Sequence, residues 1–437
     1  MRKDNGVLTN VTDDDITLME TNPEEFWKGV TEIGEYAFTT AKKLRDDVVK
    51  NTTTIIIPEN ITKIGRNAFT YCQCLRKIVI TKGVTQIGDS AFEGCSYLRE
   101  VDLPEGLTQI GNKAFQYCGA LQKIVIPEGV KTIGKSTFSG CYVLRTVVIP
   151  ESVTAIEDQA FSNCAYKLRY IDIPKSVTKI GDRAFEGSGL TSIVIPSSVR
   201  HMGEYVFGDC NKLEEVYISE GIREIPNGMF SECIKLHDVN MPNSLIKIGS
   251  FAFESCEGLD SVMIPSNVKE IGGYAFSGCK EIRNINIPNS VSVINSNTFE
   301  RCEELDTINI PEGVIEIGEQ AFIGCKNLYK IHLSSTVRKI GSSAFAKCEN
   351  LRKIEIPENV IEVGFKAFEM SVQDVSVCGA RIQGDDIIDP NSYIRKIIER
   401  RRNQKEKNLS KQTILSHHSQ ANDELEEISN EISVSDD

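Results

Sequence analysis

The sequence lacks the long apolar runs that are typical of membrane-spanning and exported proteins. No stretch approaches the roughly 18 uninterrupted apolar residues of a membrane-spanning helix. The opening residues, "MRKDNGVLTNVTDDDITLMETNPEEFW", contain no apolar run of the about 7 to 15 residues that a secretory signal has. We therefore expect a cytoplasmic protein without a membrane span, with non-classical export to the cell surface as the alternative.

The sequence also has few residues suited to catalysis or metal binding. It contains only five histidines, and none stands at a motif spacing from a serine, a cysteine or a pair of carboxylates. The H-E-x-x-H pattern of zinc proteases and the ligand run of EF-hand calcium sites are both missing. Cys72-Gln73-Cys74 has no matching second pair, so it does not predict a zinc site. The sequence therefore predicts no enzyme, no metal and no other cofactor.

Basic residues are outnumbered by acidic ones. The 49 Lys and Arg residues against 62 Asp and Glu residues give a net charge of −13. This balance favours solubility and argues against a general affinity for nucleic acid, so no nucleic-acid partner is expected. The basic run at residues 400–411 leaves nucleic-acid or membrane binding as a weak alternative, because the acidic segment "NDELEEISNEISVSDD" follows it.

The sequence does contain a repeat, and phenylalanine marks it. The markers are Phe38, Phe69, Phe92, Phe115, Phe138, Phe161, Phe185, Phe207, Phe230, Phe253, Phe276, Phe299, Phe322, Phe345 and Phe368. From Phe69 the spacing is 23 residues, except for one 24 and one 22, where a residue is added before Leu168 and one is missing before Leu190. Phe38 belongs to an earlier copy that an insertion separates from the rest. Such a period indicates a solenoid, here of 15 coils.

Each copy is predicted to have three short parts. Ile124-Val125-Ile126 alternates inward and outward and is β-branched, which favours a strand of about three residues. Pro127-Glu128-Gly129 suits a type I turn, and a second apolar pair, Val130 and Ile133, follows it. The last part, Ala91-Phe92-x-x-Cys95-x-x-Leu98, has apolar residues three apart, as in one helical or 3₁₀ turn.

One copy cannot bury its own apolar side, so neighbouring coils must complete the core. If each coil stacks on the next with equivalent residues in contact, at the strand spacing of about 4.8 Å, the 15 coils form a rod roughly 70 Å long. The predicted fold is thus an α/β repeat solenoid, a curved rod with one long parallel sheet on its concave face. Short turns or 3₁₀ and helical pieces are expected on its convex side.

The repeat resembles a known family. Leu121-x-x-Ile124-x-Ile126 matches the L-x-x-L-x-L core of leucine-rich repeats. The complete phrase "IPEGVTxIGxxAFxxCxxLxxIxIP" resembles the BspA-type leucine-rich repeat family, from about Gly29 to Val377. This resemblance implies a solenoid used for adhesion or protein recognition, often on the surface of bacteria and parasitic protists, with no catalytic residues.

Twelve of the 14 cysteines stand three residues after a marker phenylalanine. Adjacent coils would bring them close enough for disulfides on distance alone. Cysteine is among the residues most often fully buried, however, and parallel side chains in a core are poorly aimed for bonding. The pattern therefore favours reduced thiols that fill the core.

A candidate binding surface follows from the strand alternation. The residue between the two buried positions of each strand must face outward on the concave side. We assign protein binding to the apolar members of this column and to the basic residues that border it: Val79, Val125, Val148, Val194, Tyr217, Met263, Arg76, Arg99, Arg145 and Arg169. An exposed apolar stripe suggests a protein interface, although Val also simply suits a strand, and the arginines could be a solvated edge.

The predicted organisation has three parts: residues 1–28 as an N-terminal cap, 29–377 as the solenoid, and 378–437 as a short capping helix with a charged tail. Phe26 and Trp27 are expected to cover the first coil. The favoured function is a monomeric, non-enzymatic scaffold that binds a protein or peptide on its concave face. The alternative is a cell-surface adhesin for host or matrix ligands.

Overall fold

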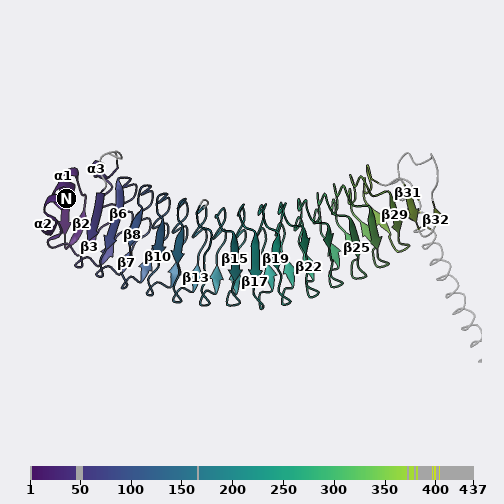
Figure 1. Cartoon of the computed structure of the whole chain (residues 1–437), viewed down its shortest axis with the longest axis horizontal. Coiled ribbons are helices and arrows are strands. Elements are labelled where there is room, and N and C mark those ends of the chain that lie inside the picture. The colour runs from purple at the N-terminus through teal and green to yellow at the C-terminus, as the bar shows by residue number, and fades with distance from the viewer. Residues whose placement is uncertain are drawn as a thin grey trace, which may run out of the picture.

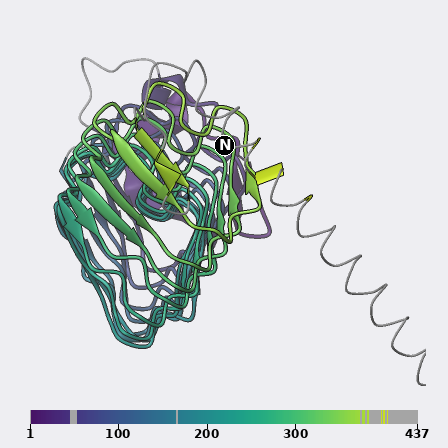
Figure 2. The same cartoon turned by 90° about the vertical axis from the view of Figure 1, so that its right-hand side faces the viewer.

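A computed structural model describes residues 2–45, 53–164, 167–371, 374–377 and 380–381, together with residues 396, 398, 399 and 403. Figure 1 shows a curved rod of stacked coils, and Figure 2, seen along the rod, shows that the coils lie almost in line with one another. Each coil crosses the rod once on each of two faces. The repeat seen in the sequence is therefore a solenoid.

One face carries the longer strands and is called the long-strand face. Its strands are β4 (Thr53–Ile57), β6 (Leu75–Ile80), β8 (Glu100–Asp102), β10 (Lys123–Val125), β12 (Thr146–Val148), β15 (Ser192–Ile195), β17 (Glu215–Ile218), β19 (Asp238–Asn240), β21 (Ser261–Val262), β23 (Asn284–Ile285), β25 (Thr307–Ile310), β27 (Lys330–Leu333), β29 (Lys353–Ile356) and β31 (Asp374–Val377). Neighbouring strands pair in parallel at equivalent positions of successive coils, for example Val125 with Val148. β32 (Ala380–Arg381) pairs antiparallel with β31.

The other face carries strands of two residues and is called the short-strand face. They are β3 (Glu32–Ile33), β5 (Lys63–Ile64), β7 (Gln86–Ile87), β9 (Gln109–Ile110), β11 (Thr132–Ile133), β13 (Ala155–Ile156), β14 (Lys179–Ile180), β16 (His201–Met202), β18 (Glu224–Ile225), β20 (Lys247–Ile248), β22 (Glu270–Ile271), β24 (Val293–Ile294), β26 (Glu316–Ile317), β28 (Lys339–Ile340) and β30 (Glu362–Val363). They also pair in parallel. At the N-terminus, β2 (Val7–Thr9) extends this face and pairs antiparallel with β1 (Arg2–Asp4).

The fold is thus a leucine-rich repeat solenoid of about 15 turns, and it differs from the expectation of one long sheet. There are two rows of strands, and each row is interrupted. On the long-strand face, the described residues between β12 and β15 form no strand, in the coil where one residue is added before Leu168. Strands this short form few hydrogen bonds, so an added residue is enough to break the pairing. The missing residue has no such effect, because β15 in the shortened coil still pairs with β17. Whether the long-strand face is concave stays a prediction.

Helix is scarce among the described residues, so the α/β label overstated it. Apart from α1 (Asp13–Thr21), α2 (Pro23–Trp27) and α3 (Lys42–Arg45), helix is described only at residues 396, 398, 399 and 403. The piece around each marker phenylalanine is a series of turns. Ser90 and Gly94 flank Phe92 with φ of 53° and 72°. These left-handed residues prevent a helix and direct backbone N–H groups to the next coil, as in the 2.8 Å bond from Phe92 to Ala114.

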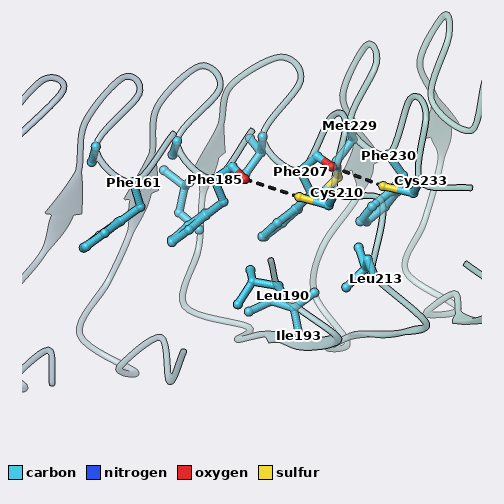
Figure 3. Packing of buried hydrophobic residues seen from close by; sticks show 14 of the residues in the cluster. Phe161, Phe185, Leu190, Ile193, Phe207, Cys210, Leu213, Met229, Phe230 and Cys233 are labelled. Atoms are coloured by element: carbon cyan, nitrogen blue, oxygen red, sulfur yellow. Dashed lines mark hydrogen bonds between the residues drawn. The ribbon is translucent and has the colours of Figure 1, made fainter. Parts of the chain in front are cut away.

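The core consists of columns of side chains from equivalent positions of successive coils. The rings of the marker phenylalanines form one stack from Phe38 to Phe368. The centroids of neighbouring rings lie 4.3 to 5.8 Å apart. Figure 3 shows four of them, Phe161, Phe185, Phe207 and Phe230, above Leu190 and Leu213. Each ring is covered on both sides by its neighbours, which explains why a single coil has no interior of its own.

The N-terminal segment covers the first coil. Helix α1 begins with a capping box, in which the Thr12 hydroxyl and the Asp15 carboxylate exchange hydrogen bonds with each other's backbone. Phe26 and Trp27 are buried and meet edge to face, with centroids 4.7 Å apart. The capping helix and the charged tail predicted for residues 378–437 lie largely outside the described residues.

Candidate protein-binding surface

The long-strand face presents a column of outward side chains, because alternate residues of each strand face the core. Ile124 and Ile126 are buried, whereas Val125 between them is 46% exposed. Val148 lies beside Val125 in the paired strand with the same exposure. These valines are therefore neighbours on an open surface.

The rest of the predicted column is brought to the same face. Val194 is 58% exposed and pairs in register with Tyr217 across β15 and β17. Met263 is the most exposed residue of the predicted set, with 75% of its surface accessible. Val79 in β6 is less exposed, because it is half-buried. Ile56, opposite Val79, is a further exposed apolar residue that the sequence analysis did not include.

The apolar column is interrupted by polar residues. Asp102, Asp172 and Asn240 occupy the outward position in three coils and are exposed. Near the first of them, Lys77 Nζ lies 2.7 Å from Glu100 Oε2 and 3.7 Å from Asp102 Oδ2. The surface is therefore a row of apolar patches of about two coils each, separated by carboxylates or an amide.

The predicted arginines border this column along the turn that links each phenylalanine to the next long strand. Arg99, Arg145 and Arg169 are exposed, and Arg76 is half-buried. The Arg76 guanidinium carbon lies 5.5 Å from the centre of the Tyr97 ring, within reach of a cation–π contact. None of the four forms a salt bridge within the described part of the chain. Their charge is available to a partner.

Exposed tyrosines gather beside these arginines, and the sequence analysis missed them. Tyr97, Tyr117 and Tyr142 line an open recess of about 810 Å³ together with Arg99. Tyr71 lies one coil earlier, where its ring approaches so closely that a Cβ on Gly94 would be 2.4 Å from it. Their positions one or two residues after a marker phenylalanine or its cysteine are turn positions that face outward, which is the signal that could have identified them.

The short-strand face is more polar than the long-strand face, and several of its charged side chains pair with opposite charges in the adjacent coils. Lys247 Nζ lies 3.1 Å from Glu224 and 3.9 Å from Glu270, its neighbours in the adjacent coils. Lys339 pairs with Glu316 at 3.0 Å in the same way. Opposite charges that alternate along a row stabilise the stacking. They leave less unpaired surface for a partner than the long-strand face does.

The family model of the "BspA type Leucine rich repeat region (6 copies)" matches residues 48–167, 165–283 and 247–373. These matches span most of the chain. The chain belongs to the BspA-type leucine-rich repeat family. No curated protein matches it.

Solved structures resemble this BspA-type protein. A leucine-rich repeat protein from Bacteroides ovatus is 30% identical with a TM-score of 0.57, and the match covers 76% of this chain and 83% of that one. A leucine-rich cell surface protein from Faecalibacterium prausnitzii is 28% identical with a TM-score of 0.44, over 77% and 83% of the two chains. The family is generally one of non-enzymatic scaffolds.

The cysteines of this BspA-type protein are structural in the residues described. Thirteen are free and buried. Most donate their thiol hydrogen to the carbonyl of the marker phenylalanine one coil earlier, as in Cys95 to Phe69 at 3.1 Å and Cys348 to Phe322 at 3.1 Å. Burial raises the pKa of Cys95 and Cys348 to about 12. Such thiols are neutral at physiological pH and are poor nucleophiles and metal ligands.

A metal site, a membrane-spanning helix or a phosphate-binding loop would each give this chain a different role. No group of three or more His, Cys, Asp or Glu residues is placed to hold a metal ion, and no helix is long and apolar enough to cross a membrane. Residues 129–136 read G-V-K-T-I-G-K-S, which matches a phosphate-binding loop pattern that the sequence analysis overlooked. Such a loop needs a following helix. Here the match runs through β11 into a turn, and Lys135 pairs with Asp158 at 2.8 Å, so the match is coincidental.

Proposed function

We propose that this solenoid is a non-enzymatic recognition scaffold that binds a protein or peptide on its long-strand face. The observation that supports the proposal is the row of exposed apolar residues, in which Val125, Val148 and Val194 lie on a strand surface with no covering element among the described residues. Exposed apolar groups arranged in contiguous patches mark interaction sites. Repeat proteins use such extended surfaces for binding.

The arginine border sets the electrostatics of this surface. Arg76, Arg99, Arg145 and Arg169 would attract an acidic segment of the partner. Such steering acts mainly on the association rate and weakens as the salt concentration rises.

The test is a triple substitution, V125D/V148D/V194D, in the full chain. Native and variant proteins are used as baits, and the proteins retained by each are quantified by mass spectrometry. We expect the specific partner to bind the variant at least tenfold more weakly, because each carboxylate would be desolvated at the interface. The side chains are exposed, so the melting temperature should hardly change.

The matched control also replaces three exposed apolar residues by Asp, but at positions away from the long-strand face. Ile234, Ile315 and Ile361 are exposed isoleucines, and their replacement by Asp should leave the partner bound. Equal retention by the V125D/V148D/V194D protein and the native protein would contradict the proposal. The cytoplasmic location and the surface alternative both stay predictions, and protease shaving of intact native cells, with a cytoplasmic control protein, separates them.

A further inference from the structure

The edge of the rod between the two strand faces is divided by charge. This turn edge consists, in each coil, of the residues from the one after the marker phenylalanine to the one after the following leucine or isoleucine. In the five coils from Phe69 to Phe161 it has five basic residues and one acidic residue, Glu93, which is half-buried. In the five coils from Phe207 to Phe299 it has eleven acidic and five basic residues. The change falls at the shortened coil of Phe185.

The basic half of the turn edge is also the aromatic half. It carries the recess lined by Tyr97, Tyr117, Tyr142 and Arg99. Arg76 joins the two properties, because its guanidinium carbon lies 5.5 Å from the centre of the Tyr97 ring. A segment that combines carboxylates with apolar side chains would fit both properties of this surface.

The C-terminal part of the same chain has that composition. Residues 421–437 contain seven acidic residues and no basic ones, with Leu425, Ile428 and Ile432 among them. Residues 400–411, which precede this segment, contain six basic residues and one acidic residue. The coils of Phe322 and Phe345, nearest the C-terminal end of the rod, have three basic residues and one acidic residue on this edge. From the coil of Phe299 backwards, the turn edge is first acidic and then basic. A tail that runs back along the edge therefore meets opposite charge at both of its charged segments.

The length of the tail permits this path. The last coil and the coil of Phe92 are twelve coils apart, which is about 58 Å at the strand spacing. The 54 residues from Ser371 to Leu425 span about 40 Å as a relaxed coil and up to about 180 Å when extended. A tethered segment of this length acts at an effective concentration on the order of 1 mM. Even weak contacts would then keep it docked.

We propose that residues 421–437 dock on the tyrosine- and arginine-lined half of the turn edge of their own chain, with residues 400–411 over the acidic half. The docked tail covers the arginine border of the long-strand face. It thereby competes with any acidic partner segment that uses the same arginines, so the tail acts as an internal competitor of partner binding.

The test uses a fluorescein-labelled synthetic peptide of residues 421–437 and two full-length proteins. One is native, and the other carries D423N/E424Q/E426Q/E427Q, which removes four charges from its tail. Fluorescence anisotropy at low salt measures peptide binding. We expect the tail-neutral protein to bind the peptide at least tenfold more tightly than the native protein, because the native tail occupies the site. The difference should shrink at high salt.

Two variants in the tail-neutral background locate the site. R99E/R145E should lose peptide binding, whereas K235E/K280E, the same change of charge in the acidic half, should keep it. If the R99E/R145E protein does not fold, R99Q/R145Q replaces it, and this variant should bind the peptide more weakly. Binding to neither protein, equal binding to both, or unchanged binding by both arginine variants would overturn the proposal. A concentration-dependent dimer of the native protein in sedimentation, formed by exchanged tails, would also overturn the intramolecular arrangement.

Discussion

At the residue scale, the cysteine thiols show how strongly the stacked core controls ionisation. Burial raises the pKa of Cys95, Cys164 and Cys348 from the ordinary value of 9.0 to about 12. A raised pKa means that the folded state binds the proton more tightly than the unfolded state. The stabilisation is therefore complete below pH 9 and is lost as the pH rises from 9 towards 12.

This sign gives a prediction for alkaline unfolding. At pH 10 each such thiol should lower the free energy of unfolding by about 1 kcal/mol relative to neutral pH. Together they should produce a steep fall of the melting temperature between pH 9 and 10.5, measured by circular dichroism. Ser371 already occupies the cysteine position in the last coil and donates to Phe345 at 2.8 Å.

A serine variant is therefore the matched control. C348S keeps a donor for the Phe322 carbonyl and removes the titrating group. It should lose less stability between pH 8 and 10 than the native protein does, even if it is less stable at pH 7. Identical pH profiles for the two proteins would show that the thiol does not titrate on unfolding.

At the element scale, the left-handed backbone conformation in the turn after each marker phenylalanine should cost free energy wherever the residue is not glycine. Gly324 and Lys347 stand at the same position of adjacent coils, with φ of 75° and 59°. An added Cβ on Gly324 would have Arg301 Cγ as its nearest neighbour, at 3.4 Å, so there is room for it. G324A should therefore destabilise by about 1 kcal/mol through the backbone alone, and K347G should stabilise by less than about 1 kcal/mol. Denaturant unfolding measures both changes, and a stabilising G324A or a destabilising K347G would contradict the interpretation.

The same position explains what the sequence could not reveal about the elements. The alternation of Ile124, Val125 and Ile126 was enough to predict a strand, because three residues already show the inward–outward–inward order of strand side chains. Glycine marks some of the left-handed positions, such as Gly94 and Gly324, but ordinary residues such as Ser90 and Lys347 occupy others and carry no mark in the sequence. Hydrogen bonds to the next coil hold them there, so only the stacked structure specifies a turn in place of a helical piece.

At the scale of the whole molecule, the candidate surface was predictable only in part. The outward column followed from the strand period, and the structure exposes Val125, Val148 and Val194 as expected. The recess of Tyr97, Tyr117 and Tyr142 was not predicted, because it forms between turns of different coils. Its lining depends on how far each turn projects, which a repeat pattern does not determine. The partner depends on these variable positions.

The whole molecule should tolerate the loss of one complete coil. Deleting residues 254–276, which are 23 residues, joins Phe253 to Ser277 and keeps every column of the core in register. Because each coil contacts only its neighbours, the shortened rod should fold with a melting temperature within a few degrees of the native value. Deleting residues 254–265 removes about half a coil and would place turn residues against strands. That protein should lose strand pairing at the junction and melt at a clearly lower temperature than the protein without residues 254–276. Equal stability of the two deletions would contradict the like-on-like stacking.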